Sequence, residues 1–108
     1  MLVVLEMLKA RINAGLQMNL HFYRDSSGVE VDVLLEAGNM IRLFEIKSSQ
    51  TINQDCFIQL NKVAAIFGER VMKKVVLYAG HEQQKRSNAE VLSYLYAGEA
   101  ATNEGTFA

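Results

Sequence analysis

The chain has few of the residues from which disulfides and zinc sites are built. Among its 108 residues there are one cysteine and two histidines. Cys56 alone cannot form a disulfide within the chain, and a lone thiol is typical of a reducing compartment, so we expect a cytoplasmic protein. His21 and His81 are isolated, and neither CxxC nor HExxH occurs, so no zinc site is expected.

Long apolar runs, a phosphate loop and an excess of one charge are also missing. The longest apolar run is too short to span a bilayer, and Glu6 interrupts the apolar start as no signal peptide would, so we expect no membrane partner. No GxxxxGK followed by Ser or Thr occurs, so this chain has no ATP site. The formal net charge of −1 counts against strong autonomous DNA binding, although Lys73-Lys74 and Lys85-Arg86 would supply a local basic edge.

What is present is the composition of one small globular domain. Half of the residues are hydrophobic and 21% are charged, and the length suffices for a core. We expect a packed domain over residues 1–98 and a flexible tail of small and polar residues over 99–108. No N-cap residue precedes the first apolar residues, so we expect an excised domain or a truncated product of a longer parent.

Hydrophobic periodicity and glycine stops predict the order of the elements. Leu5, Leu8 and Ile12 repeat at helical spacing and would form the apolar face of a first helix. The expected elements are helix 1–14, strand 19–24, a hairpin over 28–50, helix 51–68, strand 71–80, loop 81–88, and a strand or short helix over 90–98. Tight turns join the early strands and a helix precedes the later one, so we expect an α/β fold with a mixed sheet flanked by helices.

The stretch GVEVDVLLEAGNMIRLFEIKSSQ, residues 28–50, predicts a hairpin that carries charged residues on one face. Gly38 and Asn39 would form a two-residue loop, because both residue types accept positive φ at low cost. That loop places Asp32 opposite Glu45. A three-residue loop would shift the register, but after a slip of two residues both carboxylates still share one face.

The facing carboxylates allow two interpretations. Like charges directly opposed at about 5 Å are destabilising, so Asp32 and Glu45 must share a proton or bind a cation. The same register places Glu30 opposite Lys47, beside the pair. One interpretation is a solvated face with ordinary ion pairs of about 0–1 kcal/mol. The other is a site for Mg²⁺ or Mn²⁺, in which Lys47 positions or activates a water molecule.

The element order, with Asp32 and Glu45-Ile46-Lys47 on neighbouring strands, resembles the PD-(D/E)xK nuclease superfamily, which has a restriction-endonuclease-like αβββαβ core. NLHFYRDSSGVEVDVLLEAGNMIRLFEIKSSQT, residues 19–51, also looks like the C-terminal domain of predicted AAA-type ATPases, the family called DUF4143. The resemblance runs from about residue 2 to about residue 80. The proline of the superfamily's name is absent, and Val31 precedes the aspartate, at a position that varies in the superfamily.

The resemblance implies a role for each matching residue. Asp32 and Glu45 would be the carboxylate ligands of the metal, with the Ile46 carbonyl as a further ligand, and Lys47 would position the attacking water or stabilise charge on the phosphate. Glu6, on the first helix, would reach the metal through water; the alternative is a solvent-facing residue paired with a lysine. Three further residues would lie next to the ligands: Glu30, Ser48 and Gln59. The alternatives are an ion pair with Lys47 for Glu30, main-chain hydrogen bonds for Ser48 and an ordinary surface position for Gln59.

Two functions are therefore expected from different classes. The first is a Mg²⁺- or Mn²⁺-dependent DNA phosphodiesterase belonging to an AAA-type ATPase, whose ATPase domain would lie elsewhere in a longer parent chain. The second is a catalytically silent interaction or regulatory module that docks on an ATPase or another partner. The position of Glu6 relative to Asp32 and Glu45 distinguishes the two, and exposed apolar residues on the first helix would indicate a neighbouring domain or a homodimer.

Overall fold

The computed structural model describes residues 2–50, 52, 55–81, 84–85 and 89–102. The elements are α1 (Leu2–Asn13), β1 (Leu20–Arg24), β2 (Glu30–Ala37), β3 (Met40–Lys47), α2 (Asp55–Phe67), η1 (Gly68–Arg70), β4 (Val71–Tyr78), β5 (Gln84–Lys85), β6 (Glu90–Ser93), η2 (Tyr94–Tyr96) and α3 (Ala97–Thr102). The strands form one six-stranded sheet in the order β1-β2-β3-β4-β6-β5. Strands β1, β2 and β3 are antiparallel, whereas β3, β4 and β6 are parallel.

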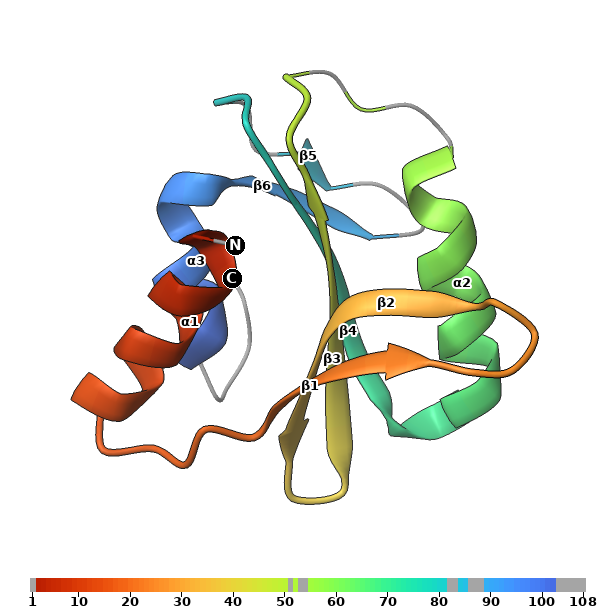
Figure 1. The fold of residues 1–108 in the computed structure, drawn as a ribbon, viewed down its shortest axis with the longest axis horizontal. Helices are drawn as coiled ribbons and strands as arrows, with labels where there is room; N and C mark the ends of the chain where they lie inside the picture. Colours follow the sequence, from red (N-terminus) through yellow and green to blue (C-terminus); the bar gives the residue numbers. More distant parts are fainter. Residues whose placement is uncertain (1, 51, 53–54, 82–83, 86–88, 103–108) are drawn as a thin grey trace.

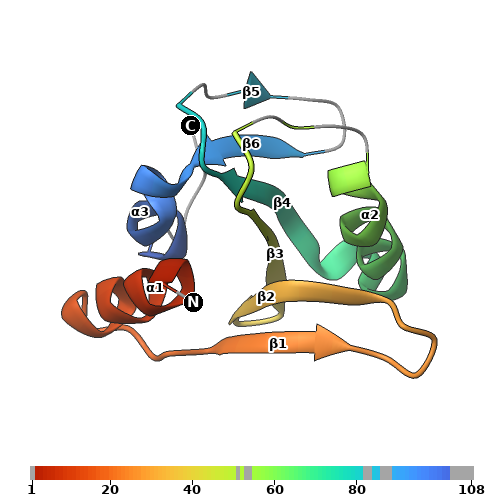
Figure 2. The ribbon, with the colours of Figure 1, turned by 45° about the horizontal axis from the view of Figure 1, so that its top comes forward.

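Helices cover both faces of this sheet. In Figures 1 and 2, α1 and α3 lie on one side of the strands and α2 lies on the other. The α/β class and the mixed sheet flanked by helices, predicted from the sequence, are confirmed. None of the helices in the described part of the chain is long and apolar enough to cross a membrane.

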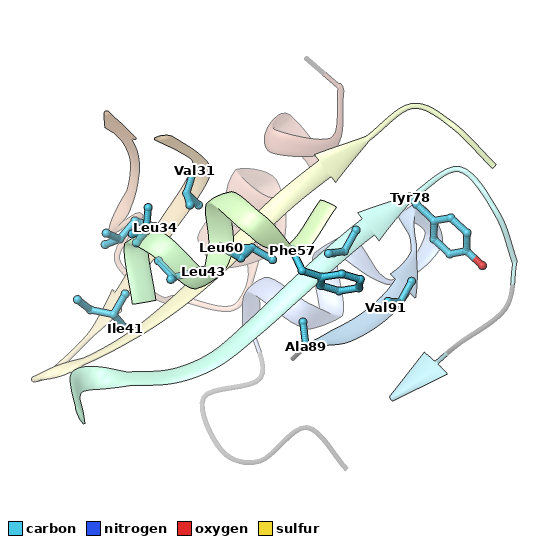
Figure 3. Packing of buried hydrophobic residues seen from close by; sticks show 11 residues of the cluster. Val31, Leu34, Ile41, Leu43, Phe57, Leu60, Tyr78, Ala89 and Val91 are labelled. Carbon is cyan, nitrogen blue, oxygen red and sulfur yellow. The ribbon is translucent and has the colours of Figure 1, made fainter. Parts of the chain in front are cut away.

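The two faces of the sheet carry separate hydrophobic clusters. Between the sheet and α2, Phe57, Leu60 and Val63 of the helix pack against strand residues such as Leu43 and Val91 (Figure 3). On the opposite face, residues of α1, the strands and α3 form the second cluster, which includes Met7, Val33, Leu35, Phe44, Val75, Leu77, Leu92, Ala97, Ala100 and Ala101. The central strands are therefore buried on both sides, as parallel strands in α/β proteins usually are.

Helix α1 buries a different face from the one that leucine spacing predicts. Met7 is fully buried, whereas Leu5 and Ile12 are half or more exposed. The helix is apolar over most of its circumference, so periodicity alone does not select the packed side. Small residues decide it, because a Cβ on Gly98 of α3 would lie only 3.2 Å from the Cβ of Ala10.

The chain after β4 is more structured than the sequence predicts. The predicted loop 81–88 contains the two-residue strand β5, and the undecided segment 90–98 is a strand followed by helical turns. The tail predicted over residues 99–108 begins inside α3, where Ala100 and Ala101 are buried. Packing therefore extends to at least residue 102, and the rest of the predicted tail, 103–108, lies outside the described residues.

Two buried arginines hold α3 in place, Arg11 from α1 and Arg42 from β3. Arg11 Nη1 donates to the Ala101 carbonyl at 2.7 Å, and Arg42 Nη1 donates to the Ala100 carbonyl at 3.2 Å. Both side chains are at most 2% exposed. The last carbonyls of a helix have no partner within the helix, and cations near them are favourable. These two hydrogen bonds explain how a helix of six residues stays packed against the rest of the domain.

Candidate functional site

A β-bulge in β2 lies at Asp32. Strand β1 pairs His21 with Leu34 and Tyr23 with Val31, so one residue of β1 faces two residues of β2. Bulges interrupt the main-chain ladder and redirect side chains, often next to functional sites. Val31 and Leu34, three positions apart, accordingly pack in the same cluster under α2, which a regular strand would not allow.

The hairpin register predicted from the Gly38-Asn39 loop is confirmed near the turn. Paired residues run from Ala37 with Met40 to Val33 with Phe44. Gly38 has a φ of 62°, as the first loop residue of a type II′ turn requires. The paired positions end one step before Asp32 and Glu45.

Beyond the regular ladder, the Asp32 carboxylate replaces a main-chain acceptor. Its Oδ2 accepts a hydrogen bond from the Ile46 N–H at 2.8 Å. In the predicted register, that N–H would have met a main-chain carbonyl of β2. Asp32 and Glu45 do lie side by side, as the sequence predicts, but they meet through their side chains, one step beyond the paired residues of β2 and β3.

The Glu45 carboxyl is buried against Asp32. Its residue is 7% exposed, and it is hydrogen-bonded both to the Asp32 carboxyl and to the Asp32 main-chain N–H. Burial, followed by the hydrogen bond with Asp32 and the charge of Asp32, raises the pKa of Glu45 to about 8, while the charge of Lys47 acts in the opposite direction. A carboxyl with this pKa keeps its proton at neutral pH, so in the absence of a cation the pair shares one proton.

Ile46 and Lys47 complete the end of β3. The Ile46 N–H points toward Asp32, and the carbonyl of the same strand residue points to the same side. The Ile46 carbonyl is therefore directed toward β2, whereas the side chain packs in the cluster under α1 and α3. Lys47 is half-buried, and its charge acts on the Glu45 carboxyl. The structure therefore brings together Asp32, Glu45, Ile46 and Lys47.

Sequence reasoning missed Tyr94, which also reaches this place. Its hydroxyl donates a hydrogen bond to the Lys47 carbonyl. Burial, and then the charge of Asp32, raise the pKa of Tyr94. No motif marks this tyrosine; the available signal was its position directly after a buried strand that runs parallel to β3 and β4. The periodicity of the segment 90–98 does not decide between strand and helix, so the sequence alone does not place this tyrosine.

Glu6 is not brought to the pair. Its carboxylate lies 3.9 Å from the Lys9 ammonium on the exposed side of α1, and its side chain is 65% exposed. Within the described ranges no group of three or more His, Cys, Asp or Glu side chains could hold a metal ion. The solvent-facing alternative for Glu6, paired with a lysine, is the arrangement in the structure.

Of the three residues expected beside the ligands, two contact each other at the start of β2. Glu30 lies 3.8 Å from Arg24 Nε and forms an ion pair there, in place of the expected pair with Lys47. Gln59 of α2 accepts a hydrogen bond from the Glu30 main-chain N–H at 3.1 Å, so it supports the start of β2. Ser48 is exposed directly after β3.

The lysines that were expected to form a basic edge contact different partners. Lys73 is paired with Glu90, and Lys74 Nζ donates to Asn61 at 2.9 Å. Consecutive strand residues point to opposite faces of a sheet, so these two lysines do not form one surface. The second expected contribution, from Lys85-Arg86, lies outside the described side chains.

The site lies where three parallel strands end. Lys47 is the last residue of β3, Tyr78 the last of β4 and Ser93 the last of β6, and the three are paired in one register. In open α/β sheets, ligands commonly bind outside the carboxyl ends of the parallel strands. The Asp32 and Glu45 carboxyls, the lysine and the tyrosine hydroxyl thus lie where ligands usually bind in this class of fold.

Comparison with known proteins gives one match. The family model described as "Domain of unknown function (DUF4143)" matches residues 1–97. No curated protein and no solved structure matches the chain. Because the match covers nearly the whole chain, the protein belongs to the DUF4143 family.

Proposed function

We propose that this domain is a divalent-metal-dependent phosphodiesterase that acts on DNA, with Asp32, Glu45 and Lys47 at its centre. The observation that carries the proposal is the buried Glu45 carboxyl, hydrogen-bonded to the half-buried Asp32 carboxyl beside Lys47. Burying one carboxyl against another is costly unless a proton or a cation neutralises them. At the ligand-binding edge of the sheet, a bound cation explains such a pair more easily than a contribution to the stability of the fold does.

The donor set fits Mg²⁺ or Mn²⁺. Carboxylate and carbonyl oxygens are the ligands these ions prefer, and one or two carboxylates with water and substrate phosphate suffice for Mg²⁺. Asp32 and Glu45 would hold the ion, with the Ile46 carbonyl as a third protein oxygen. When bound, such an ion polarises a phosphoryl oxygen and favours ionisation of water.

The remaining chemistry falls to the lysine. The Lys47 ammonium lies near the Glu45 carboxyl, where it would orient a water molecule for attack on phosphorus or compensate charge on a phosphate oxygen. Among the interactions that the structure describes at the carboxyl pair, Lys47 supplies the one positive charge. The exposed Ser48 follows at the strand end and is available to the phosphate backbone.

The order of the elements supports a restriction-endonuclease-like fold. α1, β1, β2, β3, α2 and β4 follow one another as in the αβββαβ core of the PD-(D/E)xK superfamily. The AAA-type ATPase that the sequence resemblance implies would be the parent protein, and its ATPase domain would be the natural partner. The formal net charge of −1 favours a parent chain that supplies much of the DNA affinity.

The test is nicking of supercoiled plasmid DNA in Mg²⁺ or Mn²⁺. We expect nicking that EDTA abolishes and that falls by about 100-fold or more in Lys47→Ala, in line with the loss of a positioned proton-transfer or charge-stabilising group. Lys74→Ala is the matched control, because that lysine contacts Asn61 of α2. Equal nicking by wild type and Lys47→Ala would assign the activity to a contaminant and overturn the proposal.

A docking module is the second candidate, and a specific observation favours it. Glu6 is paired with Lys9 and not with the carboxyls, while Leu5 and Ile12 leave an apolar stripe exposed on α1. A neighbouring ATPase domain or a second copy of the chain would cover such a stripe. In that case Leu5→Glu with Ile12→Glu preserves the fold and abolishes association in sedimentation experiments, and wild type shows neither metal binding nor nicking.

A further inference from the structure

The end of β3 is held by a residue from a distant part of the chain. Lys47 is the last residue of β3, and the exposed Ser48 follows it. The Tyr94 hydroxyl, from the turn after β6, donates to the Lys47 carbonyl. A terminal strand carbonyl otherwise faces water, and strand ends fray readily.

We propose that Tyr94 is a positioning residue of the carboxyl site: by fixing the Lys47 main chain, it directs the lysine side chain toward Asp32 and Glu45. The inference rests on the proposed function and adds to it a residue that no sequence motif marks. The lysine stem has several rotatable bonds, so its ammonium stays beside the pair only if the Cα from which it starts is held.

Tyr94 is itself held firmly. It begins η2 directly after β6, and the buried Ser93 caps that turn by accepting a hydrogen bond from the Leu95 N–H at 3.2 Å. The Tyr94 ring packs in the cluster under α1 and α3 together with Ile46. The ring thus anchors Tyr94 in the same cluster as Ile46, and its hydroxyl holds the next residue, Lys47.

The tyrosine also borders the acidic pair. The charge of Asp32 acts on the Tyr94 hydroxyl, and Asp32 in turn accepts from the Ile46 N–H. β2 and the turn after β6 therefore contact the neighbouring residues Ile46 and Lys47 of β3, through the Ile46 N–H and the Lys47 carbonyl. Removing the hydroxyl releases one side of this junction and leaves both carboxyls and the ring in place.

The matched variants are Tyr94→Phe and Tyr96→Phe, since Tyr96 is an exposed tyrosine in the same turn. In the metal-free protein, we expect Tyr94→Phe to shift the Lys47 carbonyl ¹³C resonance and Tyr96→Phe to leave it unchanged. In plasmid nicking with Mn²⁺, we expect Tyr94→Phe to lower kcat by about tenfold with KM changed less than about twofold, because misplaced catalytic groups cost rate more than binding. The calorimetric affinity for Mn²⁺ should stay within about twofold, because neither carboxyl is removed.

A double-mutant cycle separates positioning from a general loss of stability. If Tyr94 acts through Lys47, Tyr94→Phe lowers kcat in the wild-type background and has no further effect in Lys47→Ala. Equal loss in both backgrounds, or equal behaviour of Tyr94→Phe and Tyr96→Phe in an active protein, overturns the role of Tyr94 and leaves the proposed function standing. A wild-type protein that neither binds Mn²⁺ nor nicks DNA overturns the proposed function, and the role of Tyr94 with it.

Discussion

The two ends of the β2–β3 hairpin are built differently. At the turn end, residues 33–37 and 40–44 pair in regular register, and their side chains fill the two hydrophobic clusters. At the open end, the regular pairing of β2 with β3 stops beside the bulge between β1 and β2, and the Asp32 carboxylate accepts the hydrogen bond that a main-chain carbonyl would take. One hairpin thus combines a half that is explained by stability with a half that is not.

The difference shows where the fold departs from the most stable arrangement. A continuous ladder between apolar strands would cost nothing in electrostatics, whereas the open end buries Glu45 beside Asp32 and raises the pKa of Glu45 to about 8. Arrangements that violate local rules are concentrated at functional sites. The predictions that follow compare the two ends, beginning with the largest effect.

Truncation of Phe44 at the turn end should have the largest effect on stability. Its side chain is fully buried between the strands and the helices α1 and α3. We expect Phe44→Ala to lower the free energy of unfolding by about 3–5 kcal/mol, from lost burial and the cavity left behind. Urea unfolding measures the loss, and Met40→Ala at the partly exposed turn edge is the control. A loss below about 1 kcal/mol would contradict the assignment of the core.

Truncation of Asp32 at the open end should have a smaller effect on stability. Asp32→Ala removes the acceptor of the Ile46 N–H and the partner of the Glu45 carboxyl, which we expect to cost about 1–3 kcal/mol. The loss is limited because Asp32 is only half-buried, so water replaces part of the contacts that it makes. Glu36→Ala, on the same strand but paired with the exposed His21, serves as the control. If Asp32→Ala lowered the free energy of unfolding as much as Phe44→Ala does, the role of the open end would be chiefly structural.

The open end should also make stability depend on pH. Between about 4.5 and about 8, the folded protein keeps the Glu45 proton and the unfolded chain has released it. Folding therefore takes up a proton in this window, and the free energy of unfolding falls as pH rises. Urea unfolding at several pH values should give a flatter profile for Glu45→Gln than for wild type. Profiles of equal slope would show that Glu45 titrates normally.

The smallest effect is expected at Glu6. The carboxylate is exposed and paired only with Lys9 on the same helix, and such pairs contribute little to stability. Glu6→Gln should change the free energy of unfolding by less than about 0.5 kcal/mol and should leave the affinity for Mn²⁺ within about twofold. A tenfold loss of Mn²⁺ affinity in calorimetry would show that Glu6 contributes to metal binding.

The turn end could be predicted from the sequence because its causes are local. The Gly38-Asn39 loop fixes the register of the hairpin. The same local pattern placed Asp32 near Glu45. It did not contain the bulge, because the extra residue of β2 is defined by the pairing with β1 and not by the hairpin itself.

Two other features depend on distant parts of the chain. The buried face of α1 is selected by the close approach of Gly98 to Ala10, which no periodicity within α1 reveals. Tyr94 reaches Lys47 only because β6 joins the sheet in parallel beside β4. Non-local pairing of this kind leaves no signal in the spacing of a single sequence.

The central claim is that Asp32 and Glu45 form a metal site, and a calorimetric titration of Mg²⁺ and Mn²⁺ tests it most directly. The titration is best made above the Glu45 pKa of about 8, where no proton competes with the ion. We predict binding at about 1 mM or tighter by wild type, weaker at lower pH, and none by Asp32→Ala. Absence of heat in both proteins would contradict the claim and would leave the carboxyl pair as a structural feature of the hairpin.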